Sequence, residues 1–224
     1  MAWTDPSSIN FNTGQVITET KLEQVTADLE ALVRAGDATG LAPTTTAADI
    51  TSSTSELSMR TAGAAGNTTG WLIPAGLIGT NRLVRLIAHG DSLYNSAGAT
   101  LRMRVYLRDG AGANTLLFDK TSGATNTSGN RQPWELTLNV GALGSASSQI
   151  FWGVLHHIAS DASAATSGIG HSIWSGGAAP VVFADDSASA VDMSAARYLD
   201  VTVTWSASSA SLSWRLKYAT LQVF

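Results

Sequence analysis

The sequence predicts a mainly β protein, an antiparallel jelly-roll-like β-sandwich preceded by a short N-terminal helix. Two observations support this prediction. Several segments between residues 55 and 224 alternate apolar and polar residues, which is the period of a strand with one buried face. A helical period is seen at residues 18–35, before these segments, and many strands without intervening helices are typical of an antiparallel sandwich.

Residues 1–17 come first, and we expect them to form an extended segment that docks onto another surface. Large apolar residues are isolated in this segment and stand among polar, turn-forming residues. A segment of this kind does not fold alone, but it can be tied down by docking. The large apolar residues are Trp3, Ile9, Phe11 and Val16.

Residues 18–35 form the predicted amphipathic helix. Their apolar residues recur in steps of three and four, as in the seam of a coiled coil, and Gly36 supplies a left-handed C-terminal stop. An isolated helix of this length is marginal in water, so its apolar stripe needs a cover. The cover is either the β domain of the same chain, or a short parallel bundle or neighbouring subunit. The stripe consists of Leu22, Val25, Leu29 and Leu32.

Residues 36–54 are polar and rich in Thr and Ser, and they are predicted to be a linker. The predicted jelly-roll sandwich occupies residues 55–224. Its clearest strands, with strict alternation, are 101–108, 135–140, 199–206 and 212–218. Further strands are expected at 56–61, 70–73, 81–89, 114–119, 149–158 and 181–184.

Composition excludes several classes of function. The chain contains no cysteine, which removes a disulfide framework, a thiolate metal site and a cysteine nucleophile. The formal net charge is −4 and no basic stripe is present, so we expect no binding to nucleic acid. No apolar run approaches 18 residues and the N-terminus lacks the pattern of a signal peptide, so we also expect no insertion into a membrane.

No motif in the sequence points to catalysis, and we expect no catalytic residue, metal or cofactor. His156 and His157 are adjacent, and neighbouring residues of a strand point to opposite faces, so we expect one imidazole inside and one at the surface or at a subunit interface. Residues 170–174 begin like the nucleophile elbow of a serine hydrolase. Trp174 stands where that motif requires its last glycine, and the necessary helix is missing.

The seven tryptophans divide into core and surface candidates. Trp205 and Trp214 are in phase with apolar strand positions, and Trp71 and Trp152 stand beside other large apolar residues, so we expect all four in the core. Trp174 lies in a stretch rich in glycine and serine, where an indole is more often partly exposed. Trp174 is therefore the candidate for a ligand or subunit contact.

Some segments resemble a known group of proteins. The opening Trp3-Thr4-Asp5-Pro6, followed by GQVITETKLEQVTADLEALV, resembles the N-terminal segment of structural proteins from tailed bacteriophages and prophages. Residues 28–30 read Asp-Leu-Glu where that segment usually has Asp-Asn-Leu. The stretches 65–91, 100–119 and 197–224 are similar to the β-sandwich domain of phage fibre, spike or head-decoration proteins.

This resemblance implies a non-enzymatic virion protein, assembled in the host cytoplasm and usually a homotrimer. Its N-terminal segment, with Trp3 and Phe11, would anchor it to other virion proteins of the capsid or tail. The sandwich would project outward for host attachment or particle decoration, with a host-surface glycan as a further partner. Two alternatives remain open: a free carbohydrate-binding module, favoured by Trp174, and a polysaccharide depolymerase, which would need converging carboxylates or a Ser/His pair.

Overall fold

The structure is a computed structural model that describes residues 48–51, 53–123, 128–157, 181–189 and 191–224. Within these ranges the chain forms eleven strands and no helix, and every strand pair is antiparallel. The prediction of a mainly β, antiparallel protein is confirmed. The anchor residues Trp3 and Phe11, the helix residues Leu22, Val25, Leu29 and Leu32, and the ligand candidate Trp174 lie outside the described residues.

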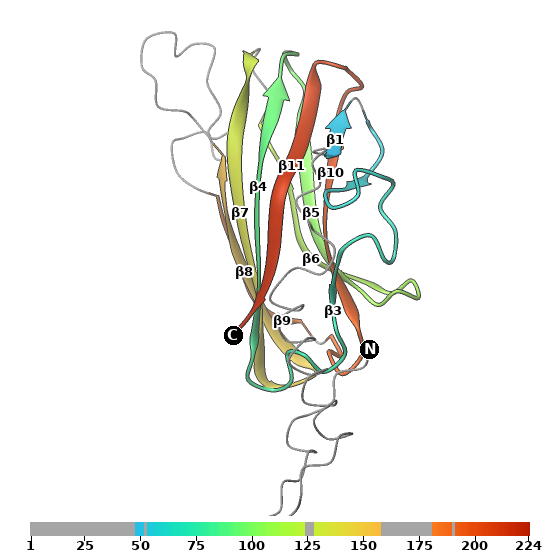
Figure 1. Cartoon of the computed structure of the whole chain (residues 1–224), viewed down its shortest axis with the longest axis vertical. Helices are drawn as coiled ribbons and strands as arrows, with labels where there is room; N and C mark the ends of the chain where they lie inside the picture. Colours follow the sequence, from blue (N-terminus) through green and yellow to red (C-terminus); the bar gives the residue numbers. More distant parts are fainter. Residues whose placement is uncertain (1–47, 52, 124–127, 158–180, 190) are drawn as a thin grey trace, which may run out of the picture.

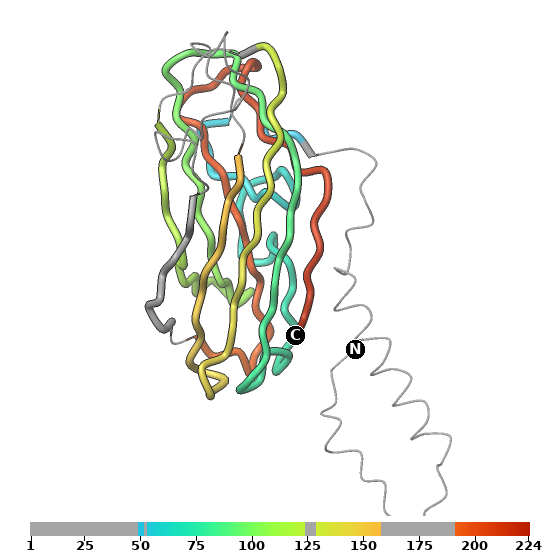
Figure 2. Tube along the Cα trace, turned by 90° about the vertical axis from the view of Figure 1, so that its left-hand side faces the viewer, coloured from blue at the N-terminus to red at the C-terminus, as the bar shows by residue number. Residues whose placement is uncertain are grey.

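The strands form two sheets whose strands run along the long axis of the molecule (Figures 1 and 2). Within the part of the chain that the structure describes, no helix is long and apolar enough to cross a membrane. The six-stranded sheet has the order β1 (Ala48–Thr51), β11 (Leu212–Val223), β4 (Leu83–Tyr94), β7 (Ser128–Ser145), β8 (Ser148–His157) and β9 (Val181–Ser189). The five-stranded sheet has the order β2 (Leu57–Ser58), β10 (Arg197–Trp205), β5 (Leu101–Arg108) and β6 (Asn114–Thr121), and β3 (Trp71–Ile73) also pairs with β10.

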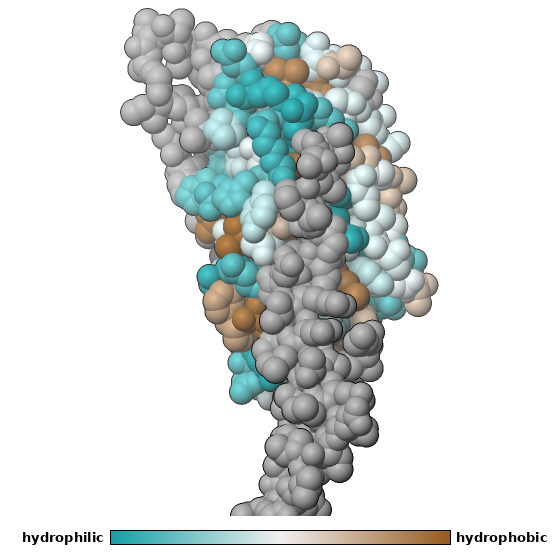
Figure 3. All heavy atoms as spheres, viewed as in Figure 1, coloured by the Kyte–Doolittle hydropathy of each residue, from teal (hydrophilic) through white to brown (hydrophobic). Residues whose placement is uncertain are grey.

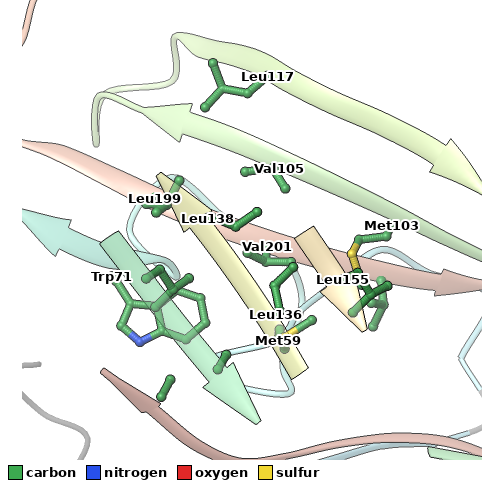
Figure 4. Packing of buried hydrophobic residues seen from close by; sticks show 14 of the residues in the cluster. Met59, Trp71, Met103, Val105, Leu117, Leu136, Leu138, Leu155, Leu199 and Val201 are labelled. Carbon is green, nitrogen blue, oxygen red and sulfur yellow. The ribbon is translucent and has the colours of Figure 1, made fainter. Parts of the chain in front are cut away.

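One hydrophobic core joins the two sheets. Alternate residues of each long strand point into it, as in β5, where Leu101, Met103 and Val105 are fully buried. Figure 4 shows side chains of both sheets meeting, with Leu136 and Leu138 of β7 beside Val201 of β10. The prediction that Trp71, Trp205 and Trp214 belong to the core is confirmed, since each is at most 3% exposed.

A close approach of backbone and ring fixes one position of this core. Gly90 of β4 pairs with Leu216 of β11 and with Trp134 of β7. A Cβ atom at Gly90 would collide with the carbonyl oxygen of Arg215 and with the indole ring of Trp134. Glycine at this position therefore allows the Trp134 ring to stack on Trp214 at a centroid distance of 4.7 Å.

Several boundaries differ from the prediction. The expected linker at 36–54 includes β1, which pairs with β11 and buries Ile50 to 1% exposure, so the β domain begins before residue 55. The strand expected at 56–61 shortens to β2. Beyond it the chain stays at the edge of β10, where the backbone N–H of Met59 donates to the carbonyl of Val201 at 2.7 Å. Other strands are longer than expected, above all β7.

Candidate functional site

The candidate site lies on the outer face of the six-stranded sheet, the face that points away from the core. Alternate side chains of β11, β4, β7 and β8 point to this face, because successive residues of a strand point to opposite sides. One line of directly paired residues crosses all four strands, and we call it the Trp152 row. Adjacent strands lie about 4.8 Å apart, so the row is about 14 Å long. Its members, in order, are Gln222, Arg85, Asn139 and Trp152.

Trp152 is the exposed aromatic residue of this row. The expectation that it belongs to the core is wrong: 37% of Trp152 is exposed, whereas its neighbour Phe151 points inward and is 2% exposed. The indole lies beside Gly141 on β7, with its Cζ3 atom 3.5 Å from the place where a Cβ of residue 141 would stand. The ring therefore lies against the surface of β7 at Gly141.

Hydrogen bonds link Arg85, Asn139 and the backbone of Trp152 within this row. The Nε atom of Arg85 donates to Oδ1 of Asn139 at 2.8 Å, and the guanidinium lies 4.8 Å from the ring centroid of Phe224. Asn139 in turn donates from Nδ2 to the carbonyl oxygen of Trp152 at 3.5 Å. Asn139 is only 4% exposed, so it forms the floor between the guanidinium and the indole.

The charge of Arg85 distinguishes it from other arginines on the same face. Arg131 and Arg215 both pair with Asp49. Arg85 forms no ion pair with any residue that the structure describes. Its contacts with Asn139 and Phe224 use one of five N–H donors, so the guanidinium keeps both charge and donors for another partner.

A second line of paired residues crosses the same four strands four residues farther along β4, about 13 Å from the Trp152 row. Tyr218 is 47% exposed, and its ring lies 6.2 Å from that of His89. No group of three His, Cys, Asp or Glu side chains within the described ranges is placed to hold a metal ion. The residues of the second line, in order, are Tyr218, His89, Glu135 and His156.

An ion-pair cluster holds β1 at the other end of this face. Arg131 and Arg215 both donate to Asp49 of β1, and Asp91 of β4 pairs with Arg131 and with Lys217. Burial opposes ionisation of Asp91, but its hydrogen bonds with Lys217 and Arg131 outweigh burial and lower its pKa. Hydrophilic residues gather toward the end of the molecule where β1 lies, and hydrophobic patches lie farther down (Figure 3).

A second buried charge lies on the outside of the five-stranded sheet. Asp200 of β10 is fully buried and accepts hydrogen bonds from Ser58 Oγ at 2.7 Å, Thr69 Oγ1 at 2.9 Å and Arg108 Nε at 2.8 Å. Burial raises the pKa of Asp200, against the effect of these partners. The contacts attach residues 56–70 to the sheet, and Gly70 allows the close approach, since its Cβ would stand 2.5 Å from the carbonyl oxygen of Leu199.

The predicted division of the histidine pair is confirmed. His156 is exposed on the outer face, and His157 is buried between the sheets at 4% exposure. Nε2 of His157 lies 2.9 Å from Ser92 Oγ and 3.1 Å from the hydroxyl of Tyr94, and burial lowers the pKa of His157 from 6.5 to about 3. This Ser/His pair lies in the core with Ser92 at 0% exposure, so a substrate does not reach it in this conformation.

Comparison of the chain with protein-family models, with curated proteins and with solved structures finds no match. The geometry of the chain's own residues therefore carries the functional argument. Sequence reasoning selected Trp174 as the ligand contact and missed Trp152 and Arg85. The signal for Trp152 was its phase, because it shares its face with the exposed His156 and not with the buried Phe151.

Proposed function

We propose that the chain is a non-enzymatic bacteriophage virion protein, attached to the particle through residues 1–17, whose β domain binds carbohydrate on the host surface. The observation that carries this proposal is the outer face of the six-stranded sheet. There an exposed indole and an arginine that has no ion-pair partner within the described part share one row, two strands apart. Carbohydrate sites combine aromatic surface with a few well-placed polar groups. Attachment through several copies needs no deep pocket, because weak contacts add up on one particle.

We also propose that the two sheets form a jelly roll. In a jelly roll, eight strands lie in two four-stranded sheets, and the chain changes sheet at almost every connection. The orders β1-β11-β4-β7 and β2-β10-β5-β6 fit this arrangement, with β5 and β6 as the one hairpin within a sheet and with β8 and β9 as an extension. Jelly rolls occur in viral capsid and lectin domains, so the strand order supports the proposal by analogy of fold.

Antibody labelling of intact particles tests attachment to a virion. Antibody raised against residues 55–224 should bind particles purified from a lysate of cells that produce the chain, because the β domain projects outward. Electron microscopy locates the label: tail labelling supports host attachment, and uniform head labelling supports decoration instead. Label absent from particles, with the antigen recovered only as free protein, contradicts the virion assignment.

A homotrimer is the expected assembly. Light scattering of the purified chain should give about three times the 23.2 kDa of one chain, because three apolar stripes of Leu22, Val25, Leu29 and Leu32 cover one another. Leu29→Asp places a charge in that seam and should give monomers, while Glu30→Gln, outside the seam, should leave the trimer intact. A wild-type chain that is monomeric at micromolar concentration would contradict association through this stripe.

A free carbohydrate-binding module is the second candidate, and exposed Trp152 favours it equally. The two functions differ in what happens to the rest of the chain. A free module predicts binding of glycan without any association with particles, whereas a virion protein predicts both. The labelling experiment therefore separates them.

A further inference from the structure

We propose that Trp152 and Arg85 form a subsite for an acidic sugar, a pyranose that carries a carboxylate, on the outer face of the six-stranded sheet. This inference rests on the proposed carbohydrate-binding function and names the chemical class of its ligand. It moves the expected contact from Trp174 to a pair of residues in the described β domain.

The exposed indole of Trp152 provides a flat aromatic surface for a sugar ring. A pyranose ring has one apolar face of C–H groups and a rim of hydroxyls, so it packs on a flat aromatic surface while its hydroxyls stay in contact with water. Trp152 offers such a surface, because 37% of it is exposed and its ring lies against the sheet at Gly141. The other four described indoles, at positions 71, 134, 205 and 214, are at most 3% exposed and cannot take this role.

The guanidinium of Arg85 is complementary in charge to a ligand carboxylate. Within the described ranges, Arg85 forms no ion pair, and its Nε bond to Asn139 leaves the terminal nitrogens with their donors. A guanidinium matches a carboxylate with two parallel hydrogen bonds, which are shorter and stronger than neutral ones. Contact with the Phe224 ring holds the guanidinium in place, so less side-chain entropy is lost when a carboxylate binds.

The strand register sets the separation of Arg85 and Trp152. Arg85 and Trp152 occupy β4 and β8, with Asn139 of β7 directly between them, so their Cα atoms are separated by about two strand spacings, or roughly 10 Å. The buried Asn139 accepts from the Arg85 side chain and donates to the backbone carbonyl of Trp152, so it bridges the two positions. A sugar ring on the indole therefore directs a ring carboxylate across Asn139 toward the guanidinium. Gln222 extends the row beyond Arg85 and offers an amide to the next sugar.

The test measures binding of full-length chain to oligosaccharides by calorimetry. The probes are hexamers of galacturonate, mannuronate and sialic acid, together with the galacturonate hexamer in its methyl-esterified form, which has the same rings without charge. We expect at least one acidic hexamer to bind with a dissociation constant below about 1 mM. In the galacturonate pair, esterification should weaken binding at least about tenfold, and added salt should weaken the acidic form.

Variants assign the two roles. Arg85→Gln should weaken binding of the acidic hexamer about tenfold or more and leave the esterified hexamer unchanged, because it removes the charged partner alone. Arg85→Lys keeps the charge, loses the paired donors and should fall between. Trp152→Ala should weaken binding of both forms. Arg102→Gln, an exposed arginine on the other sheet, is the matched control and should change nothing.

The outcomes separate this inference from the function on which it rests. Particles that carry the label while no acidic hexamer binds at about 1 mM overturn the subsite and leave the virion assignment intact. Equal binding of acidic and esterified hexamers overturns the acidic specificity. Binding that survives both Arg85→Gln and Trp152→Ala places the site elsewhere. Urea unfolding midpoints of the variants near that of the wild type show that a lost affinity is not a lost fold.

Discussion

Replacement of Asp200 by alanine is expected to lower the free energy of unfolding by about 3–5 kcal/mol, a large part of the stability of a typical domain. The variant removes one partner of a buried ion pair and leaves the Arg108 guanidinium, whose side chain is 7% exposed, without its carboxylate. An uncompensated charge in the interior costs far more than the pair itself contributes. The hydroxyls of Ser58 and Thr69 lose their acceptor in the same change.

Urea unfolding followed by tryptophan fluorescence measures this loss. Asp119→Ala is the matched control, because Asp119 also pairs with arginines, Arg102 and Arg104, at the surface of the same sheet. Exposed ion pairs contribute less than about 1 kcal/mol, so the control should stay close to the wild type. The double variant Asp200→Ala, Arg108→Met removes both charges and should recover part of the loss. Equal effects of Asp200→Ala and Asp119→Ala would contradict the assignment.

Local opening gives a second readout of the same contact. Asp200 holds Ser58 and Thr69, which flank Arg60 in the segment of residues 56–70. Release of this segment should expose the bond after Arg60 to trypsin, so Asp200→Ala should be cut there faster than Asp119→Ala under native conditions. A merely global loss of stability would instead distribute early cuts over the other arginines.

The alternation of apolar and polar residues predicted strands well where all inward residues are apolar and all outward residues are polar. β5 coincides with the predicted 101–108, because its inward residues are apolar and its outward residues are polar. β1 was missed because Ile50 is its one large apolar residue, and ion pairs of Asp49 with distant strands hold the rest. Partners so far apart in sequence leave no local signal.

The candidate site shows the same limit. The phase of the strand separates Phe151 from Trp152, so exposure of this indole was predictable from alternation alone. The contact of Trp152 with Gly141 and the position of Arg85 depend on the register of β8, β7 and β4, which no local pattern specifies. Burial of Asp200 likewise depends on residues 56–70, which cover an outward strand position that alternation marks as exposed.

Acid is expected to destabilise the fold through His157, at up to about 1.4 kcal/mol per pH unit below pH 6.5. Burial among aromatic rings lowers the pKa of His157 to about 3 in the folded chain, whereas the unfolded chain titrates near 6.5. Between these values the unfolded state binds a proton that the folded state does not bind. Stability is therefore complete above pH 6.5 and is lost as the pH falls toward 3.

The range from pH 6.5 to 4.5 isolates the contribution of His157 to the free energy of unfolding. The aspartates with lowered pKa values, which include Asp91 and Asp119, release their stabilisation at lower pH, where their own carboxylates take up protons. Over these two units the wild type should lose about 2–3 kcal/mol in urea unfolding experiments. The readout is the slope of the unfolding free energy against pH.

His157→Gln removes the titration and keeps a polar group near Ser92 and Tyr94, which both contact Nε2 of the imidazole. The variant should start less stable at pH 7.5, since an amide fills the site less well than a ring, but its slope should be nearly flat from pH 6.5 to 4.5. His156→Gln, one residue away on the exposed face, should keep the wild-type slope. Asp200 is present in both proteins, so its protonation contributes equally to both slopes. Parallel slopes for the wild type and His157→Gln would therefore mean that the acid sensitivity arises from a group other than His157.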